Sequence, residues 1–310
     1  MIKLSDKELI QFVQTEYESY QLQNFDIDRE SAFKEITREL VEELEDLNSL
    51  ETKQARLEHF KVKNANIEDY AEKLLTIDDN RSVLYGIRNL GGNPDIPFIQ
   101  LRPNFQINSK SGALKIFEQL RDVLKVFKPL HLSFHTREKI DADFFGSIHM
   151  VSKVSDICAL SPWPKEERIT FESISDDSYH DWYRLGYEEF HRDSPELSTK
   201  VLVNRAESME DSRNQGLLKF VNLDGERIGL ISGEKSDFLG HSGVYFHEIF
   251  ITKNFKGQGL AKAIQRKFVN SFCRDLEYVW DTIDSHNLPS FKTAFSNGRR
   301  AVRYECFVKL

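Results

Sequence analysis

Cysteine is scarce in this chain of 310 residues, which has Cys158, Cys273 and Cys306 and no others. An odd number of widely separated cysteines argues against a disulfide framework and gives none of the ligand spacings typical of a metal site. We therefore expect reduced, mostly buried thiols and a function without a metal ion.

Long apolar runs are absent as well. No stretch approaches the roughly 20 apolar residues of a membrane-spanning helix, and residues 1–8 lack the apolar core of a secretory signal peptide. The sequence therefore predicts a cytoplasmic protein that does not enter a membrane. A formal net charge of −8 argues against nucleic acid as the main partner, because phosphate neutralisation needs a basic face.

The length and composition of the chain suit about two domains, since 310 residues with 40% hydrophobic content can form two cores. Apolar residues recur at helical spacing from Leu4 to Thr76, which predicts a helical cap. Two prolines interrupt any regular element at residues 159–165. We place the boundary near Pro162, which divides the chain into 1–160 and 161–310.

The most informative stretch is residues 246–261, where an apolar strand enters a glycine-bearing loop that opens an amphipathic helix. Gly257 and Gly259 let the backbone approach an anion, and the first N–H groups of the helix then point at it. A dinucleotide fingerprint needs a third glycine where Lys262 stands, and the Gly-Lys-Ser/Thr of a P-loop is missing. The loop therefore predicts an anion site of another kind.

Residues 256–261, Lys-Gly-Gln-Gly-Leu-Ala, resemble the acetyl-CoA-binding motif of the GNAT family of N-acetyltransferases, which reads Gln/Arg-x-x-Gly-x-Gly/Ala at a helix start. Downstream, a strand-like run at 278–283 is followed by Asn287 and a short helix that ends near Gly298, as in that family. Residues 303–310 alternate enough to be the last strand of such a sheet. Upstream, Asp224-Gly225 between two apolar runs predicts a hairpin, after a first strand at 168–174 and helices between 177 and 213.

The resemblance covers roughly Ile169 to the C-terminus and implies an α/β (α+β) fold, the acyl-CoA N-acyltransferase fold. This is a mixed, mostly antiparallel twisted sheet flanked by helices, here with a helical N-terminal region and a smaller GNAT-like unit. It implies an enzyme that transfers acetyl from acetyl-CoA directly to an amine of a small molecule or peptide. The implied cofactor-binding residues are Ile249, Phe250, Ile251, Lys256, Gly257, Gln258, Gly259, Leu260, Ala261 and Asn287.

For the catalytic base we predict Glu248, which lies on the strand before the loop, beside Phe246 and Phe250. Apolar neighbours should raise the pKa of this carboxyl, although a glutamate here can also hold the substrate amine or the fold. His247 is better explained by packing, because adjacent strand residues face opposite sides unless a bulge intervenes.

Two departures from the family pattern leave the general acid open. The tyrosine that often protonates the leaving thiolate is replaced by Ala294, and an acid common in relatives that modify protein N-termini is replaced by Thr282. Asp281, Asp284 and Tyr304 are substitutes by position only. An alternative is therefore a weak or inactive member of the fold that binds CoA or a partner.

Two further groups of residues have open roles. Lys262, Arg266 and Lys267 follow the loop and are either contacts for the adenosine phosphates or the wet face of a helix. Aromatic residues on an early helix either shape the acceptor pocket or belong to the core: Trp182, Tyr183, Tyr187, Phe190 and His191.

The first half contains a partial repeat, because Ile99–Phe105 aligns with Ile249–Phe255 and each is followed by an amphipathic helix and a strand. The first copy has one glycine, Gly112, where the second has its loop. We interpret residues 81–157 as a degenerate GNAT-like unit that has kept only a packing role. One working site per chain is therefore expected, and the oligomeric state is open.

Overall fold

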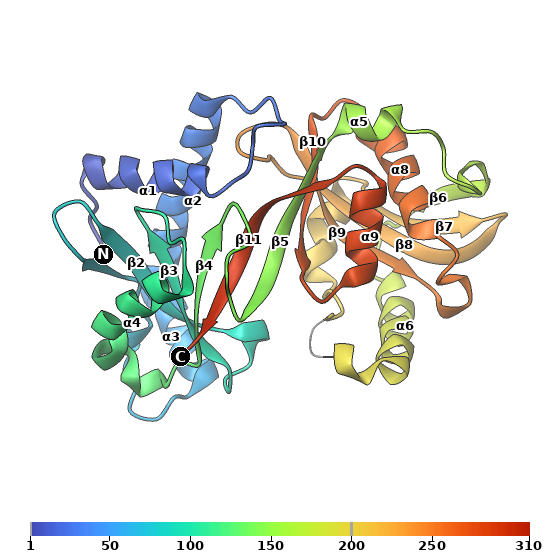
Figure 1. The fold of residues 1–310 in the computed structure, drawn as a ribbon. Helices are drawn as coiled ribbons and strands as arrows, with labels where there is room; N and C mark the ends of the chain where they lie inside the picture. The colour runs from blue at the N-terminus through green and yellow to red at the C-terminus, as the bar shows by residue number, and fades with distance from the viewer. Residues whose placement is uncertain (1, 199–200) are drawn as a thin grey trace. The chain divides into compact units, whose positions relative to one another are not determined.

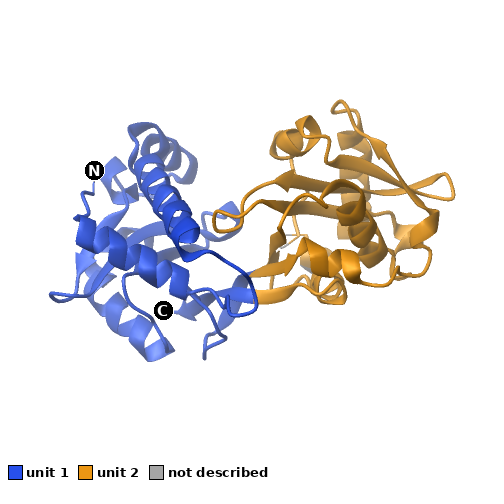
Figure 2. Cartoon of the chain, turned by 90° about the horizontal axis from the view of Figure 1, so that it is seen from above, with its two compact units in different colours: residues 1–148, 302–310 blue, residues 149–301 orange. Residues whose placement is uncertain are grey.

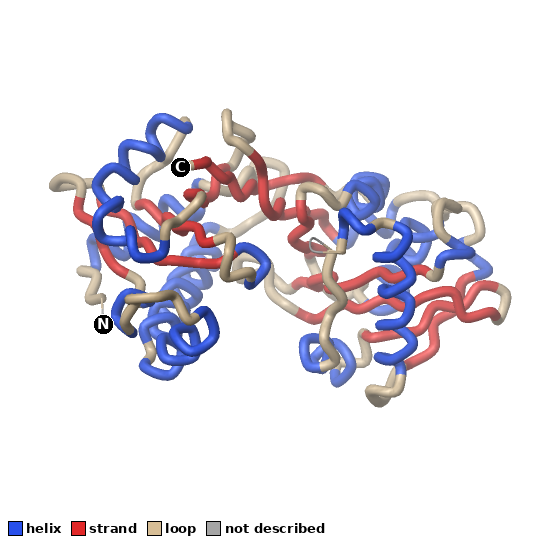
Figure 3. Tube along the Cα trace, turned by 90° about the horizontal axis from the view of Figure 1, so that it is seen from below, coloured by secondary structure: helices blue, strands red, loops and turns tan. Residues whose placement is uncertain are grey.

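The computed structural model describes residues 2–198 and 201–310. The chain forms two compact units, Met1–Ile148 with Val302–Leu310, and His149–Ala301 (Figure 2). Each unit combines a sheet with packed helices (Figure 3). Among the described residues, no helix is both long and apolar enough to span a bilayer.

The first unit begins with three helices, continues into a sheet and has one long helix between two of its strands (Figure 1). Its elements are α1 (Asp6–Glu18), α2 (Arg29–Asn48), α3 (Leu50–Phe60), η1 (Ile67–Tyr70), β1 (Lys73–Thr76), β2 (Ser82–Asn89), η2 (Leu90–Gly92), β3 (Pro97–Pro103), α4 (Lys110–Leu124), η3 (Lys125–Phe127) and β4 (His131–Thr136).

The strands of the first unit lie in the order β1-β2-β3-β4-β11, where β11 is Arg300–Lys309. Neighbours are antiparallel except β3 and β4, which α4 connects as a parallel pair. Helix α4 buries Ile116 and Leu120 against this sheet, in a core that also contains Cys306 and Val308 of β11.

The second unit begins within β5 and continues into α5, and from β6 onward its elements follow the order strand, helices, hairpin, strand, helix, strand, helix (Figure 1). They are β5 (Phe144–Lys153), α5 (Val154–Ala159), η4 (Glu166–Arg168), β6 (Ile169–Ser173), α6 (Tyr179–Asp193), η5 (Pro195–Leu197), η6 (Glu207–Met209), α7 (Glu210–Asn214), β7 (Leu218–Leu223), β8 (Glu226–Lys235), β9 (Gly243–Ile251), η7 (Lys253–Phe255), α8 (Leu260–Phe272), β10 (Tyr278–Asp284) and α9 (Leu288–Ser296).

The sheet of the second unit follows the order β5-β10-β9-β8-β7-β6. The pairs β6–β7, β7–β8 and β8–β9 are antiparallel. Strands β9 and β10 are parallel and are connected by α8. One face packs on α5 and α8 through residues such as Val244 and Phe268, and the other packs on α6 through Tyr183 and Phe250. The sheet is therefore covered by helices on both faces.

Most predicted elements are confirmed. The hairpin turns at Asp224 and Gly225, both with positive φ as a type I′ turn requires. The helical cap ends earlier than predicted, because residues 73–76 form β1 and pair with β2 rather than continuing a helix. The thiols of Cys273 and Cys306 are buried, Cys158 is half-buried, and all three are free.

The boundaries of the two units do not divide the chain into an N-terminal and a C-terminal half. Strand β11 pairs with β4 through Tyr304–Lys309, so most of the predicted last strand belongs to the first unit. Residues 149–159 join the second unit, because Val154 and Ile157 pack in the core beneath α8. The division of domains at Pro162 stays a prediction.

Candidate functional site

A β-bulge in β9 sets the geometry of the site. Ser232 of β8 pairs with Glu248 and Gly233 pairs with Phe246, so His247 has no partner in this register. Val244 and Phe246 face α8 before the bulge, and Ile249 and Ile251 face it afterwards. The alternation therefore shifts by one residue, and His247 and Glu248 both point away from α8.

Strands β9 and β10 part at the same level. In the described residues their parallel pairing runs from Gly243 with Tyr278 to Tyr245 with Trp280 and extends no further. Beyond this point β9 keeps its pairing to β8 through Ile249, Phe250 and Ile251. The edge of β9 that faces β10 therefore offers backbone groups along a widening fork.

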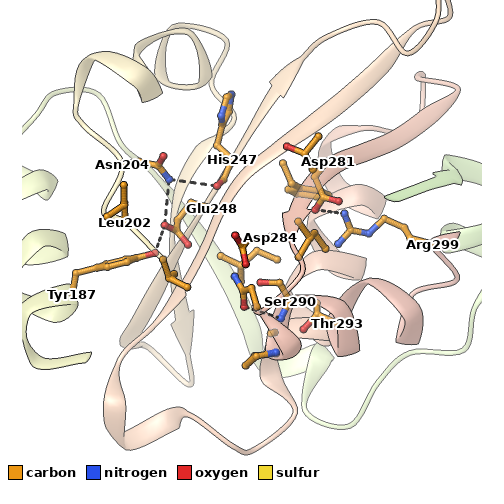
Figure 4. A pocket seen from close by; sticks show the side chains of 18 residues that line it. Tyr187, Leu202, Asn204, His247, Glu248, Asp281, Asp284, Ser290, Thr293 and Arg299 are labelled. Atoms are coloured by element: carbon orange, nitrogen blue, oxygen red, sulfur yellow. Dashed lines mark hydrogen bonds and ion pairs between the residues drawn. The ribbon is translucent and has the colours of Figure 1, made fainter. Parts of the chain in front are cut away.

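A cavity of about 290 Å³ occupies this fork. Its walls come from β9, β10, α6, α9 and the segment before η6, as the close view shows (Figure 4). The lining residues are Tyr187, Val201, Leu202, Asn204, Phe246, His247, Glu248, Ile249, Ala261, Asp281, Thr282, Ile283, Asp284, Asn287, Pro289, Ser290, Thr293 and Arg299. Its size approaches that of typical small-molecule sites.

Glu248 projects from the bulge into the network that borders this cavity (Figure 4). Its Oε2 accepts hydrogen bonds from the hydroxyls of Tyr183 and Tyr187, the latter at 2.7 Å, and from Nδ2 of Asn204 at 3.4 Å. Burial raises the pKa of the Glu248 carboxyl, and the hydrogen bonds oppose this rise. Burial therefore favours the protonated form of Glu248, and the donors on α6 and Asn204 favour the carboxylate.

His247 shares the face of Glu248 but has a different partner. Its Nε2 lies 2.6 Å from Oε2 of Glu234 on β8, and its ring packs against Tyr245. The β-bulge that lets His247 and Glu248 share one face is therefore present. The imidazole of His247, however, is hydrogen-bonded to the Glu234 carboxylate. His247 also lines the cavity, so a packing role for this residue stays a prediction.

The glycine loop follows β9 through the short helix η7. Gly257 and Gly259 have φ values of 76° and 73°, a left-handed conformation that favours glycine. Gly259 is the N-cap of α8 and provides no side-chain hydrogen bond to its first turn. The backbone N–H groups at the start of α8, which include those of Leu260 and Ala261, are therefore available to an anion.

Two side chains of the loop have defined positions. Nζ of Lys256 lies 4.1 Å from the centre of the Phe190 ring, and desolvation there lowers the pKa of its amine. Gln258 is exposed, donates from Nε2 to the Asn254 carbonyl, and accepts from Nζ of Lys165 at 2.9 Å. The loop therefore carries positive charge on both sides.

Lys262, Arg266 and Lys267, whose roles the sequence leaves open, separate into two groups. Arg266 forms a buried ion pair with Glu166, and Nζ of Lys267 donates to the Glu166 carbonyl at 3.0 Å. Both are thus structural. Lys262 alone stays at the loop, with Nζ 3.7 Å from the centre of the Trp163 ring.

Asn287 borders the cavity at the start of α9. Its Oδ1 accepts a hydrogen bond from the Ser290 amide at 3.3 Å, so it caps this helix. Gly298 follows α9 with φ of 77°, as expected for a closing glycine. Ala294 is fully buried, so the position of the missing tyrosine points into the core.

The proposed substitutes for a general acid lie in different places. Asp281 forms a buried ion pair with Arg299, its Oδ1 has no hydrogen-bond partner, and burial raises its pKa. Asp284 borders the cavity and accepts from the His286 amide at 2.8 Å. Tyr304 belongs to the first unit, where it pairs with Thr136, and it is not among the residues that line the cavity.

The first unit repeats the topology of the fork without its loop. Strands β3 and β4 are parallel only from Phe98 to Gln100, and α4 connects them as α8 connects β9 and β10. The first turn of α4 is capped, because Oγ of Ser109 accepts from the Gly112 amide at 3.1 Å. This helix start therefore differs from that of α8.

Sequence reasoning missed two contributors to the site. Asn204 lies in an irregular segment, where no periodicity indicates a role. The Asp281–Arg299 pair joins β10 to the end of α9, a contact that only the folded chain brings together. Among the described residues, no cluster of three or more His, Cys, Asp or Glu side chains is placed to hold a metal ion.

Comparison with known families gives a match over the second unit. Residues 171–294 match the model of the acetyltransferase (GNAT) family. The match contains α6, the bulged β9, the glycine loop and most of α9. The matched family is the one that the sequence of this region resembles. The strand pairings confirm the mixed, mostly antiparallel fold expected from the sequence.

Several solved structures resemble the chain at low sequence identity. A GCN5-related N-acetyltransferase from Sphaerobacter thermophilus is 11% identical, with a TM-score of 0.45 over 85% of this chain and 91% of that one. A GNAT-family acetyltransferase from Colwellia psychrerythraea is also 11% identical, at 0.45 over 84% and 97%. A tandem GNAT protein from the clavulanic acid biosynthesis pathway is 12% identical, at 0.45 over 84% and 95%. No protein of curated function matches the chain.

Proposed function

Because residues 171–294 match the model of the acetyltransferase (GNAT) family, we propose that this chain is an acyl-CoA-dependent N-acyltransferase. The donor is acetyl-CoA, and the acceptor is an amine of a small molecule or peptide. The single observation that carries this proposal is the Glu248 carboxylate, which lies at the bulge of β9 where the strands part around the cavity.

The cofactor-binding part of the proposal uses the fork and the loop. Backbone groups of Ile249, Phe250 and Ile251 would hold the pantetheine arm along the free edge of β9, and Asn287 would meet it from α9. The amides from Gly257 to Ala261 would hold the pyrophosphate, with Lys256 beside them. The positive φ of both glycines and the uncapped start of α8 support this assignment.

In the chemical step, Glu248 would accept a proton from the acceptor's ammonium group, which frees the amine for attack. The amine would then form a bond to the acyl carbon of the thioester and the C–S bond would break. CoA would leave as a thiolate that takes up a proton from solvent as the nitrogen loses its second one. A backbone N–H of β9 would donate to the acyl oxygen, where negative charge develops. The raised pKa of Glu248 supports its role, because a base works best when its pKa approaches the working pH.

A second candidate is a CoA-binding protein without turnover. It is favoured by the buried Ala294 in place of a tyrosine and by the three donors that already engage Oε2 of Glu248. A carboxylate that only braces α6 against β9 would have the same partners. The two candidates share the cofactor site and differ in the chemical step.

Thermal unfolding and thiol release separate these candidates. Acetyl-CoA in large excess over its Kd should raise the Tm, because a ligand that binds only the native state stabilises it. Thiol release is then measured with polyamines, aminoglycosides, amino acids and peptides as acceptors. A Tm that stays constant contradicts both candidates, whereas stabilisation without release with any acceptor leaves the binding protein.

The variant Glu248→Gln tests the base directly. It should lower kcat by roughly 100-fold or more, the usual contribution of a positioned base, and leave the acetyl-CoA-induced rise in Tm intact. Glu226→Gln is the matched control, because Glu226 is exposed at the start of β8. Equal turnover in both variants would remove Glu248 as the base.

A further inference from the structure

Residues 160–168 contain the predicted domain boundary and pack across α8. We call this segment the strap. Its two prolines predict an irregular path, and the structure shows how that path is held. The Arg266 guanidinium on α8 pairs with Glu166 and also donates to the Leu160 carbonyl, and both charged side chains are buried. The strap is therefore a fixed part of the second unit.

Trp163 is the centre of this strap and is held at both ends. Its indole N–H donates to Oδ1 of Asn297 at 2.9 Å, and its backbone N–H donates to Oε2 of Glu166 at 2.9 Å. Asn297 is fully buried and donates to the Lys262 carbonyl at 3.0 Å. The ring is thus positioned over the first turn of α8.

Two ammonium groups flank the glycine loop beside this ring. Nζ of Lys262 lies 3.7 Å from the centre of the Trp163 ring, and its Cε lies 3.5 Å from where a Cβ on Gly259 would be. Nζ of Lys165 donates to Oε1 of Gln258, between the two glycines. The strap therefore brings a second cation to the loop that the sequence motif does not contain.

Neither ammonium group has a carboxylate partner within the part of the chain that the structure describes. The partners of Lys165 and Lys262 are an amide oxygen and an aromatic ring. The neighbouring Lys253, by contrast, pairs with Asp193 at 2.9 Å. Asp224 interacts with Lys165 electrostatically but forms its ion pair with Arg168. In a protein of net charge −8, two ammonium groups that form no ion pair among the described residues, beside an uncapped helix start, indicate an anionic ligand.

We propose that Lys165 and Lys262 form the subsite for the 3′-phosphate of CoA, with Trp163 holding Lys262 in place. This inference rests on the proposed function, in which the loop amides hold the pyrophosphate. The 3′-phosphate is the further anionic group of that cofactor, and lysine binds phosphate as a mobile point charge. The strap would thereby make binding selective for CoA over 3′-dephospho-CoA.

Calorimetric titration of the full chain with CoA and with 3′-dephospho-CoA tests this subsite. The wild-type protein should bind CoA about tenfold more tightly, the effect of one or two charge-assisted contacts. Lys165→Gln and Lys262→Gln should each reduce this ratio, and the double variant should bring it close to one. The affinity for 3′-dephospho-CoA should change by less than about twofold.

Two controls keep the outcomes distinct. Lys262→Arg retains the charge and should retain the ratio, and Lys253→Gln removes a paired cation and should leave it unchanged. Equal wild-type affinities for the two ligands, or a ratio that survives in the double variant, would overturn the subsite alone. No binding of either ligand would overturn the proposed function as well.

Discussion

At the scale of single residues, the environment of Glu248 determines what the site can do. The carboxyl group is held by donors from α6 and by Asn204, and burial raises its pKa. Hydrogen bonds from Tyr183 and Tyr187 act in the opposite direction because they stabilise the charged form. The balance sets the pH at which Glu248 becomes able to accept a proton.

The pH dependence of turnover should report this balance. A base acts when deprotonated, so kcat should fall as the pH drops through the Glu248 pKa, which lies above its ordinary value of 4.5. Tyr187→Phe removes one stabilising donor and should move this acidic limb to higher pH. Initial rates across a pH series for both proteins provide the measurement.

The pH profile of the residual turnover of Glu248→Gln is the control, and it should show no acidic limb. If the variant shows the wild-type limb, another group titrates. If Tyr187→Phe moves the limb to lower pH, the hydrogen bond does not stabilise the carboxylate, and the geometry of the pair needs another explanation.

At the scale of elements, close packing of α6 on β9 holds this network. The Phe250 ring lies 5.5 Å from the rings of Trp182 and Tyr183 and 5.7 Å from that of Tyr187, measured between centres. Gly186 permits the approach, because a Cβ there would lie 2.2 Å from Cζ of Phe250. The helix is therefore close to the strand at the level of Glu248.

Gly186→Ala should destabilise the second unit by about 1–3 kcal/mol, because a methyl group forced into a packed core displaces its neighbours. It should also lower turnover more than acetyl-CoA affinity, since it displaces Tyr183 and Tyr187 from Glu248. Denaturant unfolding and steady-state kinetics measure the two effects. Leu185→Ala, at an exposed position of the same helix, is the control, and an equally mild effect of both would contradict the packing argument.

Elements with strong local signals were predictable from sequence. The Asp224-Gly225 turn fixes a hairpin, and the glycine loop followed by amphipathic spacing predicts the start of α8. Strand β1 was missed because Leu74 and Leu75 fit a helical pattern as well as a strand, and only pairing with β2 decides between them. The bulge at His247 depends on the partner strand and has no local signal.

The residues of the candidate site were likewise predictable only where the signal is local. The motif predicts the residues of the loop, because their roles depend on backbone conformation and short spacing. Asn204 and the pairing of Asp281 with Arg299 depend on contacts between distant segments. Such contacts follow from the fold and cannot be obtained from the periodicity of one sequence.

At the scale of the whole molecule, the two units contain the same fork topology with unequal helix starts. Helix α8 begins at an uncapped Gly259, whereas α4 begins at Ser109, whose side chain already occupies an amide of the first turn. The exchange of the last strand adds a second asymmetry. Strand β11 follows α9 in the chain but supplies Cys306 and Val308 to the core of the first unit.

Deletion of residues 302–310 should therefore destabilise the first unit. It removes the strand that pairs with β4 and three fully buried residues, Cys306, Phe307 and Val308. Hydrogen exchange should show lost protection in β3 and β4 while β8 and β9 remain protected. Lys309→Gln, at an exposed position of the same strand, is the control. Protection lost first in β8 and β9 would contradict this assignment of the strand.

The central claim is that one chain carries one working acyl-CoA site, built by the loop of the second unit. Calorimetric titration of the full chain with acetyl-CoA tests it most directly, with Gly257→Asp as the paired variant. Aspartate tolerates the left-handed conformation at this position but places a negative charge where the pyrophosphate would lie. The account predicts saturation at one acetyl-CoA per chain and loss of binding in the variant. Two equivalents bound, or undiminished binding by Gly257→Asp, would contradict it.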